Sequence, residues 1–172
     1  MWAWEFSKMI NIAERNGWAR PVSMQNHYNL IYREEEREMM PLCRDAGIGT
    51  TPYSPLASGR LARDFRMVET ARSKGDQIAM AKYDSTAEAD QIVIDRVAEL
   101  AEKHGVAMAH IALAWILRKE PVSAPIVGAN RISYLEEAMG AFEVNLSDDE
   151  MTYLESAYVP HRVVGHGTTA TV

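Results

Sequence analysis

A turn in the last third of the chain has residue types that could bind an anion. Residues 125–131 read PIVGANR, so the small residues Gly128, Ala129 and Asn130 lie between an apolar run and a predicted helix that begins near Arg131. Such a turn exposes backbone N–H groups beside the positive end of the helix dipole, and an arginine adds a guanidinium that can bind phosphate through two hydrogen bonds. We therefore predict an anion site. Alone the pattern is weak, because glycine turns near an arginine occur on many surfaces.

A second group of candidate ligand-binding residues lies in residues 22–62. Two short apolar runs, at 22–25 and 48–52, enclose a charged segment that we predict as a helix over 33–45, which makes one βαβ unit. Side chains at the carboxyl ends of parallel strands meet at a common rim, where α/β folds bind ligands. Gln25 ends the first strand, and its amide both donates and accepts hydrogen bonds. The alternative is a glutamine that only satisfies backbone groups at the strand end.

Hydrophobic periodicity and stop signals predict the elements that hold these residues. An amphipathic helix over residues 2–15 is closed by Asn16 and Gly17. Two further helices begin at capping boxes, in which a serine is followed three residues later by a glutamate. The remaining predictions are these: capping boxes at Ser85 with Glu88 and at Ser147 with Glu150, helices over 107–119 and 131–139, and a third strand over 124–127.

The sequence also predicts how the strands pair and what the segments between the helices and strands form. Three strands separated by helices imply parallel pairing through right-handed crossovers. Residues 58–84 contain glycines and many charges without clean periodicity, so we predict a long loop that acts as a lid. Residues 159–172 lack a helical pattern and are predicted to form a tail.

Composition narrows the class of protein. The 172 residues are 47% hydrophobic and 24% charged, as expected for one globular domain, and the net charge of −6 argues against nucleic acid or an anionic membrane as a partner. The single cysteine, Cys43, is expected to lie in the core rather than to act as a nucleophile. No disulfide can form within the chain, and the first 17 residues lack the apolar run of a signal peptide. We therefore expect a cytoplasmic protein.

Other reactive residue types receive simpler interpretations. His27 is near the predicted rim, but a lone histidine there is more often a structural hydrogen-bonding group than a catalytic one. His161 and His166 do not have the spacing of a metal site, and we predict no metal. The charge run over residues 33–38 has acids and bases at neighbouring positions of a helix, which predicts a solvated helix face.

These motifs together resemble the aldo-keto reductase family, particularly its bacterial branch related to the potassium-channel β subunit. The resemblance runs over nearly all of residues 1–172 and places Met1 just after the fifth strand of the family barrel. It implies an α/β fold that is a partial (β/α)8 TIM barrel: strands six to eight, their helices and a C-terminal extension. A complete barrel needs about 250 residues and eight strands. We therefore expect the C-terminal half of such an enzyme.

The resemblance also implies residues that bind NADP. In the family, the equivalent of Gln25 bonds the nicotinamide amide, that of Tyr53 stacks on the nicotinamide ring, and that of Glu137 contacts adenine. Two positions depart from the family pattern, because Tyr134 replaces a common glutamine and Ala138 a common asparagine, which weakens the case for NADP over NAD. The resemblance assigns the pyrophosphate loop to Ser54, Leu56, Ala57 and Gly59, and the 2′-phosphate site to Gly128 and Arg131.

The family chemistry is hydride transfer from NADPH to an aldehyde or ketone. Its catalytic aspartate, tyrosine, lysine and histidine all belong to the first half of the barrel, so we assign no catalytic residue here and expect this chain to be inactive alone. The alternative is a truncated, non-catalytic nucleotide-binding or interaction fragment. Two open sheet edges predict self-association or pairing with a missing N-terminal half. The apolar barrel interior expected to be uncovered includes Val22, Met24, Ile48 and Ile126.

Overall fold

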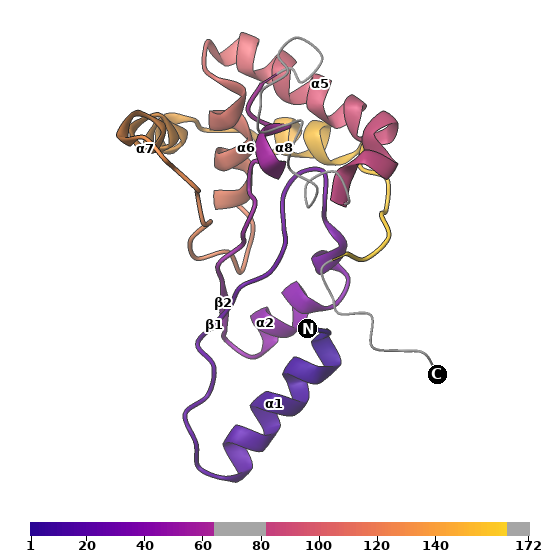
Figure 1. Cartoon of the computed structure of the whole chain (residues 1–172), viewed down its shortest axis with the longest axis vertical. Helices are drawn as coiled ribbons and strands as arrows, with labels where there is room; N and C mark the ends of the chain where they lie inside the picture. The colour runs from indigo at the N-terminus through magenta and orange to yellow at the C-terminus, as the bar shows by residue number, and fades with distance from the viewer. Residues whose placement is uncertain (64–81, 165–172) are drawn as a thin grey trace.

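The structure is a computed structural model that describes residues 1–63 and 82–164. A helix, a two-stranded sheet and a second helix form one end of the elongated molecule, and the helices of residues 87–155 form the other end (Figure 1). In chain order the first part contains α1 (Ala3–Arg15), β1 (Ser23–Met24), η1 (Glu34–Glu36), α2 (Met39–Asp45), β2 (Gly49–Thr50) and η2 (Ala57–Gly59). The second part contains η3 (Asp84–Thr86), α5 (Ala87–His104), α6 (Met108–Leu117), α7 (Ile132–Met139), η4 (Gly140–Glu143) and α8 (Asp148–Glu155).

The sheet is parallel, as the crossover argument predicts. β1 pairs with β2, with Ser23 opposite Gly49 and Met24 opposite Thr50. Isolated parallel bridges continue this pairing from His27 to Tyr53 and from Tyr53 to Ile126. Three extended segments therefore run side by side, and their carboxyl ends lie at a common edge.

The predicted third strand is shorter than expected. Residues 124–127 form a single bridge at Ile126 rather than a continuous strand. The N–H groups of Ser123 and Ala124 both point at the Thr50 carbonyl, at 2.8 and 3.5 Å, and Pro125 has no N–H to donate. The regular ladder is therefore interrupted, and it resumes where Ile126 donates to Pro52.

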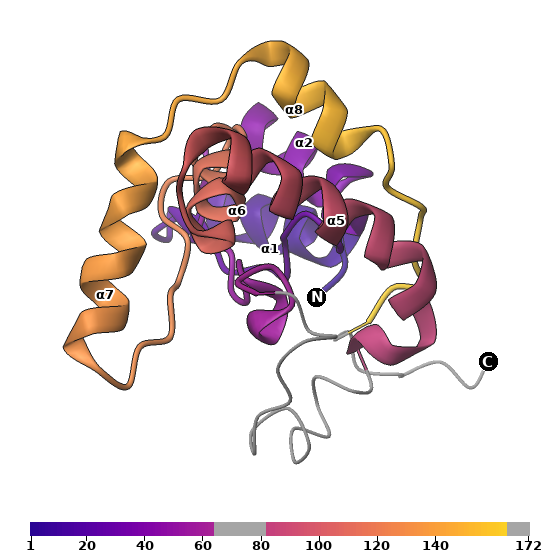
Figure 2. The same ribbon diagram turned by 90° about the horizontal axis from the view of Figure 1, so that it is seen from above.

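Two hydrophobic clusters hold the chain together. The smaller one joins α1, α2 and the strands, and contains Phe6, Ile10, Met39, Cys43 and Ile48. Cys43 is fully buried, and burial raises the pKa of its thiol to about 11, as a core cysteine requires. The larger cluster is centred on α5 and α6, which cross closely in both ribbon views (Figure 2), and includes the fully buried Trp115.

The interior face of the sheet differs in part from the prediction. Val22 and Ile126 are exposed, at 83% and 41%, as expected for an uncovered barrel interior. Ile48 is instead buried in the cluster below α1 and α2, and Met24 packs against the same cluster. These two side chains pack toward α1 and α2 and do not face an open barrel interior.

The charge run over residues 33–38 is not a solvated helix face. The predicted helix over 33–45 is broken into η1 and the short α2, and Glu34 and Glu35 are buried. Glu34 accepts hydrogen bonds from the Tyr158 hydroxyl and the His161 backbone N–H, both at 2.7 Å, and Arg37 pairs with it at 2.6 Å. Tyr158, His161 and Arg37 therefore replace water around the Glu34 carboxylate.

Arg33 extends this network to the second helical group. Its guanidinium lies 2.7 Å from Glu36 and 3.0 Å from Glu155, and Lys119 reaches Glu155 at 2.9 Å. The Trp115 indole donates to the same Glu155 carboxylate at 2.9 Å. A half-buried ion-pair network thus joins the first βαβ unit to α6 and α8.

One of the two predicted capping boxes is formed. Ser147 and Glu150 cap α8 reciprocally, with N···O distances of 2.9 and 3.2 Å. Ser85 does not cap α5, because the helix begins after Thr86, whose hydroxyl lies 2.8 Å from the Asp90 carboxylate. The helices predicted over 2–15, 107–119 and 131–139 are confirmed as α1, α6 and α7, with small shifts at their ends.

Two predictions fall wholly or partly outside the described residues. The lid predicted over 58–84 includes residues 64–81, and the tail over 159–172 includes residues 165–172. The described start of the tail packs on the core, where His161 lies 2.6 Å from Asp90 and both side chains are 3% exposed. Among the helices that the structure describes, none is both long and apolar enough to cross a bilayer.

Candidate functional site

Gln25 lies directly after β1, on the face of the sheet away from α2. Its neighbours identify the two faces, since Met24 packs on the α1–α2 cluster and the Asn26 amide contacts the Met40 sulfur at 3.6 Å. Strand alternation then places Gln25 on the opposite face, where its side chain is exposed. Its amide is therefore accessible to a ligand at the carboxyl edge of the sheet.

Tyr53 is part of a stack of three rings at this edge. The His27 imidazole lies between Tyr32, at a centroid distance of 4.1 Å, and Tyr53, at 5.1 Å, and both pairs are nearly parallel. The Lys82 ammonium lies 4.7 Å from the centre of the Tyr53 ring. Tyr53 remains partly exposed, so its ring plane is fixed by the stack while part of the ring faces solvent.

The loop after Tyr53 has an unusual backbone. Ser54, Ala57 and Ser58 have positive φ angles of 57°, 48° and 56°, and Gly59 has one of 95°. The left-handed conformation costs about 1–2 kcal/mol for each residue that has a Cβ, so surrounding contacts must hold it. Leu56, the remaining predicted loop residue, packs against the large core cluster. Backbone strain of this kind is concentrated at functional sites.

A buried tyrosine holds the start of this loop. The Tyr83 hydroxyl lies 2.7 Å from His27 Nε2, 3.1 Å from Asn29 Nδ2 and 3.3 Å from Ser54 Oγ. Asn29 also donates to the Ser54 carbonyl at 2.9 Å. Neither Tyr83 nor Asn29 is a candidate in the sequence analysis. They are 54 positions apart, and no local pattern in the sequence connects them.

His27 is an uncharged structural group in this arrangement. Its side chain is 3% exposed, and burial together with the nearby Lys82 charge lowers its pKa to about 3. Its Nε2 atom is bonded to Tyr83, and its Nδ1 atom is buried without a hydrogen-bond partner among the described residues. A neutral, enclosed imidazole suits the structural interpretation better than a catalytic one.

The predicted phosphate residues occupy a different environment. Gly128, Arg131 and Glu137 are exposed, and α7, which begins just after Arg131, has no buried residue. The Arg131 guanidinium lies 5.9 Å from the centre of the Tyr134 ring. The bridge between Tyr53 and Ile126 places the start of this segment beside the first group at the carboxyl edge. The phosphate and adenine candidates then continue outward along α7.

The remaining histidine prediction concerns a metal. His161 is bonded to the Asp90 carboxylate, and this hydrogen bond raises its pKa although burial opposes the charged form. His166 lies outside the described residues. Within residues 1–63 and 82–164, no three His, Cys, Asp or Glu side chains gather in the way that a metal ion would require.

Comparison with known proteins identifies the family. Residues 3–159 match the model of the aldo/keto reductase family. Versiconal hemiacetal acetate reductase from Aspergillus parasiticus is 46% identical over 164 residues, which are 95% of this chain and 48% of that protein. Aldo-keto reductase dtxS3 from Metarhizium robertsii is 46% identical over 166 residues, 96% of this chain and 44% of the relative.

A third relative, the putative aryl-alcohol dehydrogenase C977.14c from Schizosaccharomyces pombe, is 42% identical over 167 residues, 96% of this chain and 46% of that protein. The chain thus spans about half the length of the curated relatives it matches. These relatives are fungal and give no support to the predicted bacterial branch. The family match covers both segments of the candidate site, Gln25 to Gly59 and Gly128 to Glu137, and this chain belongs to the aldo/keto reductase family.

Proposed function

We propose that this chain is the nucleotide-binding part of an NADP-dependent oxidoreductase that reduces aldehydes or ketones by hydride transfer. The observation that carries the proposal is the strained loop over residues 54–59, beside an exposed amide and a partly exposed aromatic ring at the carboxyl edge of a parallel sheet. Ligands bind at this edge in α/β folds. The names of the relatives, which include reductases and an aryl-alcohol dehydrogenase, support the same reaction class.

The residues fit a dinucleotide in character and order. Gln25 would bond the nicotinamide amide, and Tyr53 would stack on the nicotinamide ring. Ser54 and Gly59 would lie against the pyrophosphate, where the absence of a side chain at Gly59 allows close approach. Arg131, at the N-terminal end of α7, would hold the 2′-phosphate, with Gly128 leaving space for close approach and Glu137 reaching adenine.

When bound, NADPH would supply the hydride. This chain positions the nucleotide, and we assign none of its residues to proton transfer. His27 is buried and neutral, and Tyr53 keeps its proton because burial raises the pKa of its hydroxyl. A complete reaction would therefore need groups from the rest of a family barrel, of which this chain would supply strands six to eight.

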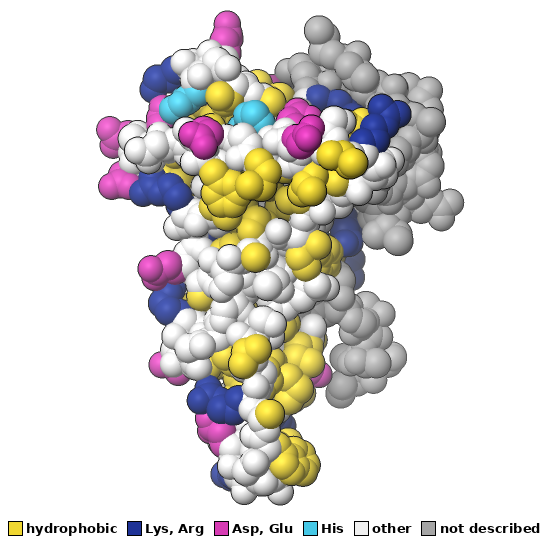
Figure 3. Space-filling view, turned by 90° about the vertical axis from the view of Figure 1, so that its left-hand side faces the viewer, with side chains coloured by type: hydrophobic (Ala, Val, Ile, Leu, Met, Phe, Trp, Pro, Cys, Tyr) yellow, Lys and Arg dark blue, Asp and Glu magenta, His cyan; other side chains and the backbone are white. Residues whose placement is uncertain are grey.

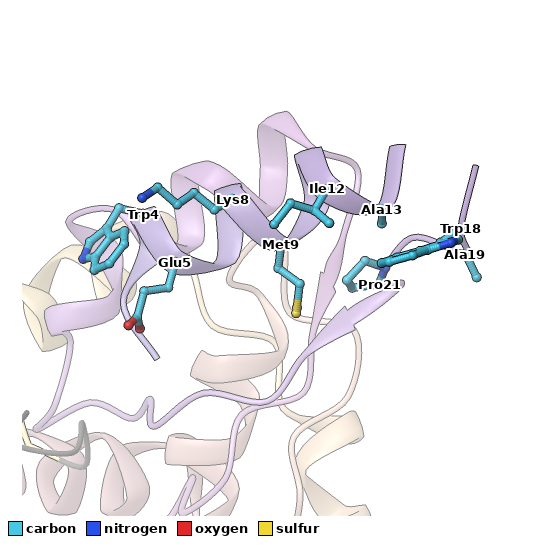
Figure 4. Close-up of a pocket in the computed structure, with 9 residues that line it drawn as sticks. All are labelled: Trp4, Glu5, Lys8, Met9, Ile12, Ala13, Trp18, Ala19 and Pro21. Atoms are coloured by element: carbon cyan, nitrogen blue, oxygen red, sulfur yellow. The ribbon is translucent and has the colours of Figure 1, made fainter. Parts of the chain in front are cut away.

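The first exposed apolar face supports such an incomplete barrel. Along α1 and the segment after it, Trp4, Met9, Ile12, Trp18 and Pro21 line a shallow groove (Figure 4). The Trp18 side chain is 64% exposed. Contiguous exposed apolar side chains of this size mark interfaces in most proteins.

The second exposed face lies on α7, beyond the other end of the sheet. Ile132, Leu135 and Met139 follow one another at helical spacing, and Phe142 continues the face; all four are more than half exposed. Figure 3 shows hydrophobic side chains gathered on the side of the molecule that carries α7. We propose the complementary part of a family barrel as the common partner of these two faces, and self-association as the alternative.

Binding and turnover test this function directly. The purified chain is titrated with NADPH, monitored by calorimetry, and then supplied with a generic aldehyde while NADPH absorbance is followed. We expect binding without turnover, and turnover only after the first half of a family barrel is added. The absence of NADPH binding under both conditions would overturn the nucleotide-binding function. Turnover by the chain alone would contradict the assignment of catalysis to other residues.

The partner is tested by sedimentation. Alone, the chain should self-associate as its concentration rises, because two apolar faces are exposed; with the complementary half it should form a one-to-one complex. A concentration-independent monomer that melts cooperatively would contradict the proposal. A cytoplasmic location remains a prediction.

A further inference from the structure

We propose that Tyr83 is a positioning residue for the nucleotide, acting through a chain of hydrogen bonds that fixes both the Tyr53 ring and the left-handed Ser54. The inference deepens the proposed function and rests on it. Tyr83 is fully buried and does not belong to the loop it holds. Its hydroxyl contacts His27, Asn29 and Ser54 together.

The direction of the hydrogen bonds that Asn29 makes follows from its contact with Ile31. Its Oδ1 atom accepts from the backbone N–H of Ile31 at 3.1 Å, so its Nδ2 atom must point the other way. The two amide hydrogens then go to the Ser54 carbonyl at 2.9 Å and to the Tyr83 oxygen at 3.1 Å. Asn29 is fully buried, so no water competes for these hydrogens.

The hydrogen bond from Asn29 to Tyr83 in turn determines how the Tyr83 hydroxyl bonds to His27. Because the Tyr83 oxygen accepts from Asn29, its own proton is free to go to His27 Nε2, the nearest acceptor at 2.7 Å. The second lone pair of the oxygen can accept from the Ser54 hydroxyl at 3.3 Å. His27 then carries its proton on Nδ1, a buried nitrogen with no hydrogen-bond partner among the described residues, and this tautomer is part of the proposal.

Two parts of the nucleotide site depend on this chain. The His27 ring sets the plane of Tyr53 by stacking, and the two bonds to Ser54 hold the first left-handed residue of the loop. Burial raises the pKa of Tyr83 to about 12, and the pKa of His27 is about 3, so both groups are uncharged at neutral pH. The contacts therefore need no change of protonation at neutral pH, and we propose that they form before the nucleotide binds, which would reduce the ordering that binding requires.

The test compares Tyr83→Phe with a matched control, Tyr153→Phe, whose hydroxyl bonds to Glu99 on the surface of α5. Amide hydrogen exchange is measured without nucleotide. In Tyr83→Phe we expect exchange at Ala57, Gly59 and Leu61 to rise about tenfold or more, as loss of buried hydrogen bonds predicts. Exchange in α6 should not change, and the control should match the unmodified chain. No change at the loop, or an equal rise throughout the protein, would overturn a positioning role.

Nucleotide affinity gives the second readout. We expect the Kd for NADPH to rise about tenfold in Tyr83→Phe and to stay unchanged in Tyr153→Phe. If the unmodified chain binds no NADPH, the proposed function fails, and the exchange experiment still decides whether Tyr83 holds the loop. Equal NADPH affinity of the variant and the unmodified chain would overturn the inference but leave the proposed function intact.

A measurement on the unmodified chain covers the case in which Tyr83→Phe does not fold. Long-range proton–nitrogen correlation spectra distinguish the two neutral tautomers of histidine. We expect His27 to carry its proton on Nδ1, with Nε2 as the acceptor. A proton on Nε2 would reverse the hydrogen bond with Tyr83 and overturn the proposed chain of hydrogen bonds.

Discussion

The two segments of the proposed nucleotide site differ in what holds them. Residues 53–59 are strained but enclosed, with Ser54 tied to Asn29 and Tyr83 and with Ala57 fully buried. Residues 128–137 carry the phosphate and adenine candidates on a helix with no buried side chain. The first segment is fixed by contacts within this chain. The position of the second segment depends on what packs against the exposed face of α7.

This difference separates two sources of affinity. A preformed loop lowers the cost of ordering when a ligand binds, whereas an exposed arginine supplies charge without fixed geometry. We therefore expect the nicotinamide end of the site to be present in the isolated chain. The 2′-phosphate end should gain strength only when α7 is held by a partner.

The largest expected effect comes from removing the support below the first segment. Leu61 is fully buried under the loop, so Leu61→Ala should lower the free energy of unfolding by about 2–5 kcal/mol through the cavity it leaves. Denaturant unfolding measures this loss. The matched control is Leu135→Ala on α7, which should change stability by less than about 0.5 kcal/mol because Leu135 is 54% exposed. Equal losses in the two variants would remove the distinction between the segments.

A smaller effect is expected in the pH dependence of the free energy of unfolding, through His27 beside the first segment. The pKa of His27 is about 6.5 when unfolded and about 3 when folded, so the unfolded chain binds the proton more tightly below pH 6.5. The stability contribution is complete above pH 6.5 and falls as the pH decreases, by about 2 kcal/mol between pH 6.5 and pH 5. Chemical unfolding across this range should show the slope, and His27→Gln should lack it. An unchanged slope in the variant would assign the pH dependence to other groups.

His161 should act in the opposite direction. Its pKa is raised by the hydrogen bond to Asp90, so its stabilising effect is complete below pH 6.5 and is lost as the pH rises through the folded value. The ratio of stability at pH 9 to that at pH 6 should therefore be higher in His161→Gln than in the unmodified chain. The same ratio in both proteins would mean that the pair with Asp90 contributes no charge-dependent stability.

The smallest effect is expected at the exposed segment. Arg131→Ala should weaken NADPH binding by about tenfold, the loss of one charge-assisted contact, and should leave NADH binding and stability unchanged. Calorimetric titration with both nucleotides measures the difference. Addition of the complementary barrel half should enlarge it, since α7 would then be fixed. An equal loss for NADPH and NADH would show that Arg131 does not contact the 2′-phosphate.

Local patterns predicted much of this fold. Helical periodicity located α1, α6 and α7, and the Ser147–Glu150 box located α8, because each depends on residues a few positions apart. The family resemblance predicted the candidate residues at the sheet edge, and their roles remain predictions. The features that were predicted wrongly depend on contacts between residues that are far apart in the sequence. Glu34 is buried because Tyr158 and His161 reach it from the end of the chain.

The same distance explains why the centre of the candidate site could not be predicted. Tyr83 lies in a segment that has no periodicity, and it meets Asn29 and His27 only after the chain has folded back. The side to which Ile48 points was likewise set by α1 and α2, which cover the opposite face of the sheet. Neither arrangement leaves a pattern in neighbouring residues.

The hydrogen bond from the His161 backbone to Glu34 has a consequence for synthesis of the protein. The two residues are 127 positions apart, and a ribosome that adds about 5–20 residues per second needs roughly 6–25 s to cover that interval. During this time the Glu34 carboxylate has neither His161 nor Tyr158 to replace its water. The first βαβ unit, although made earlier than these residues, therefore reaches its final structure only when Tyr158 and His161 have been added.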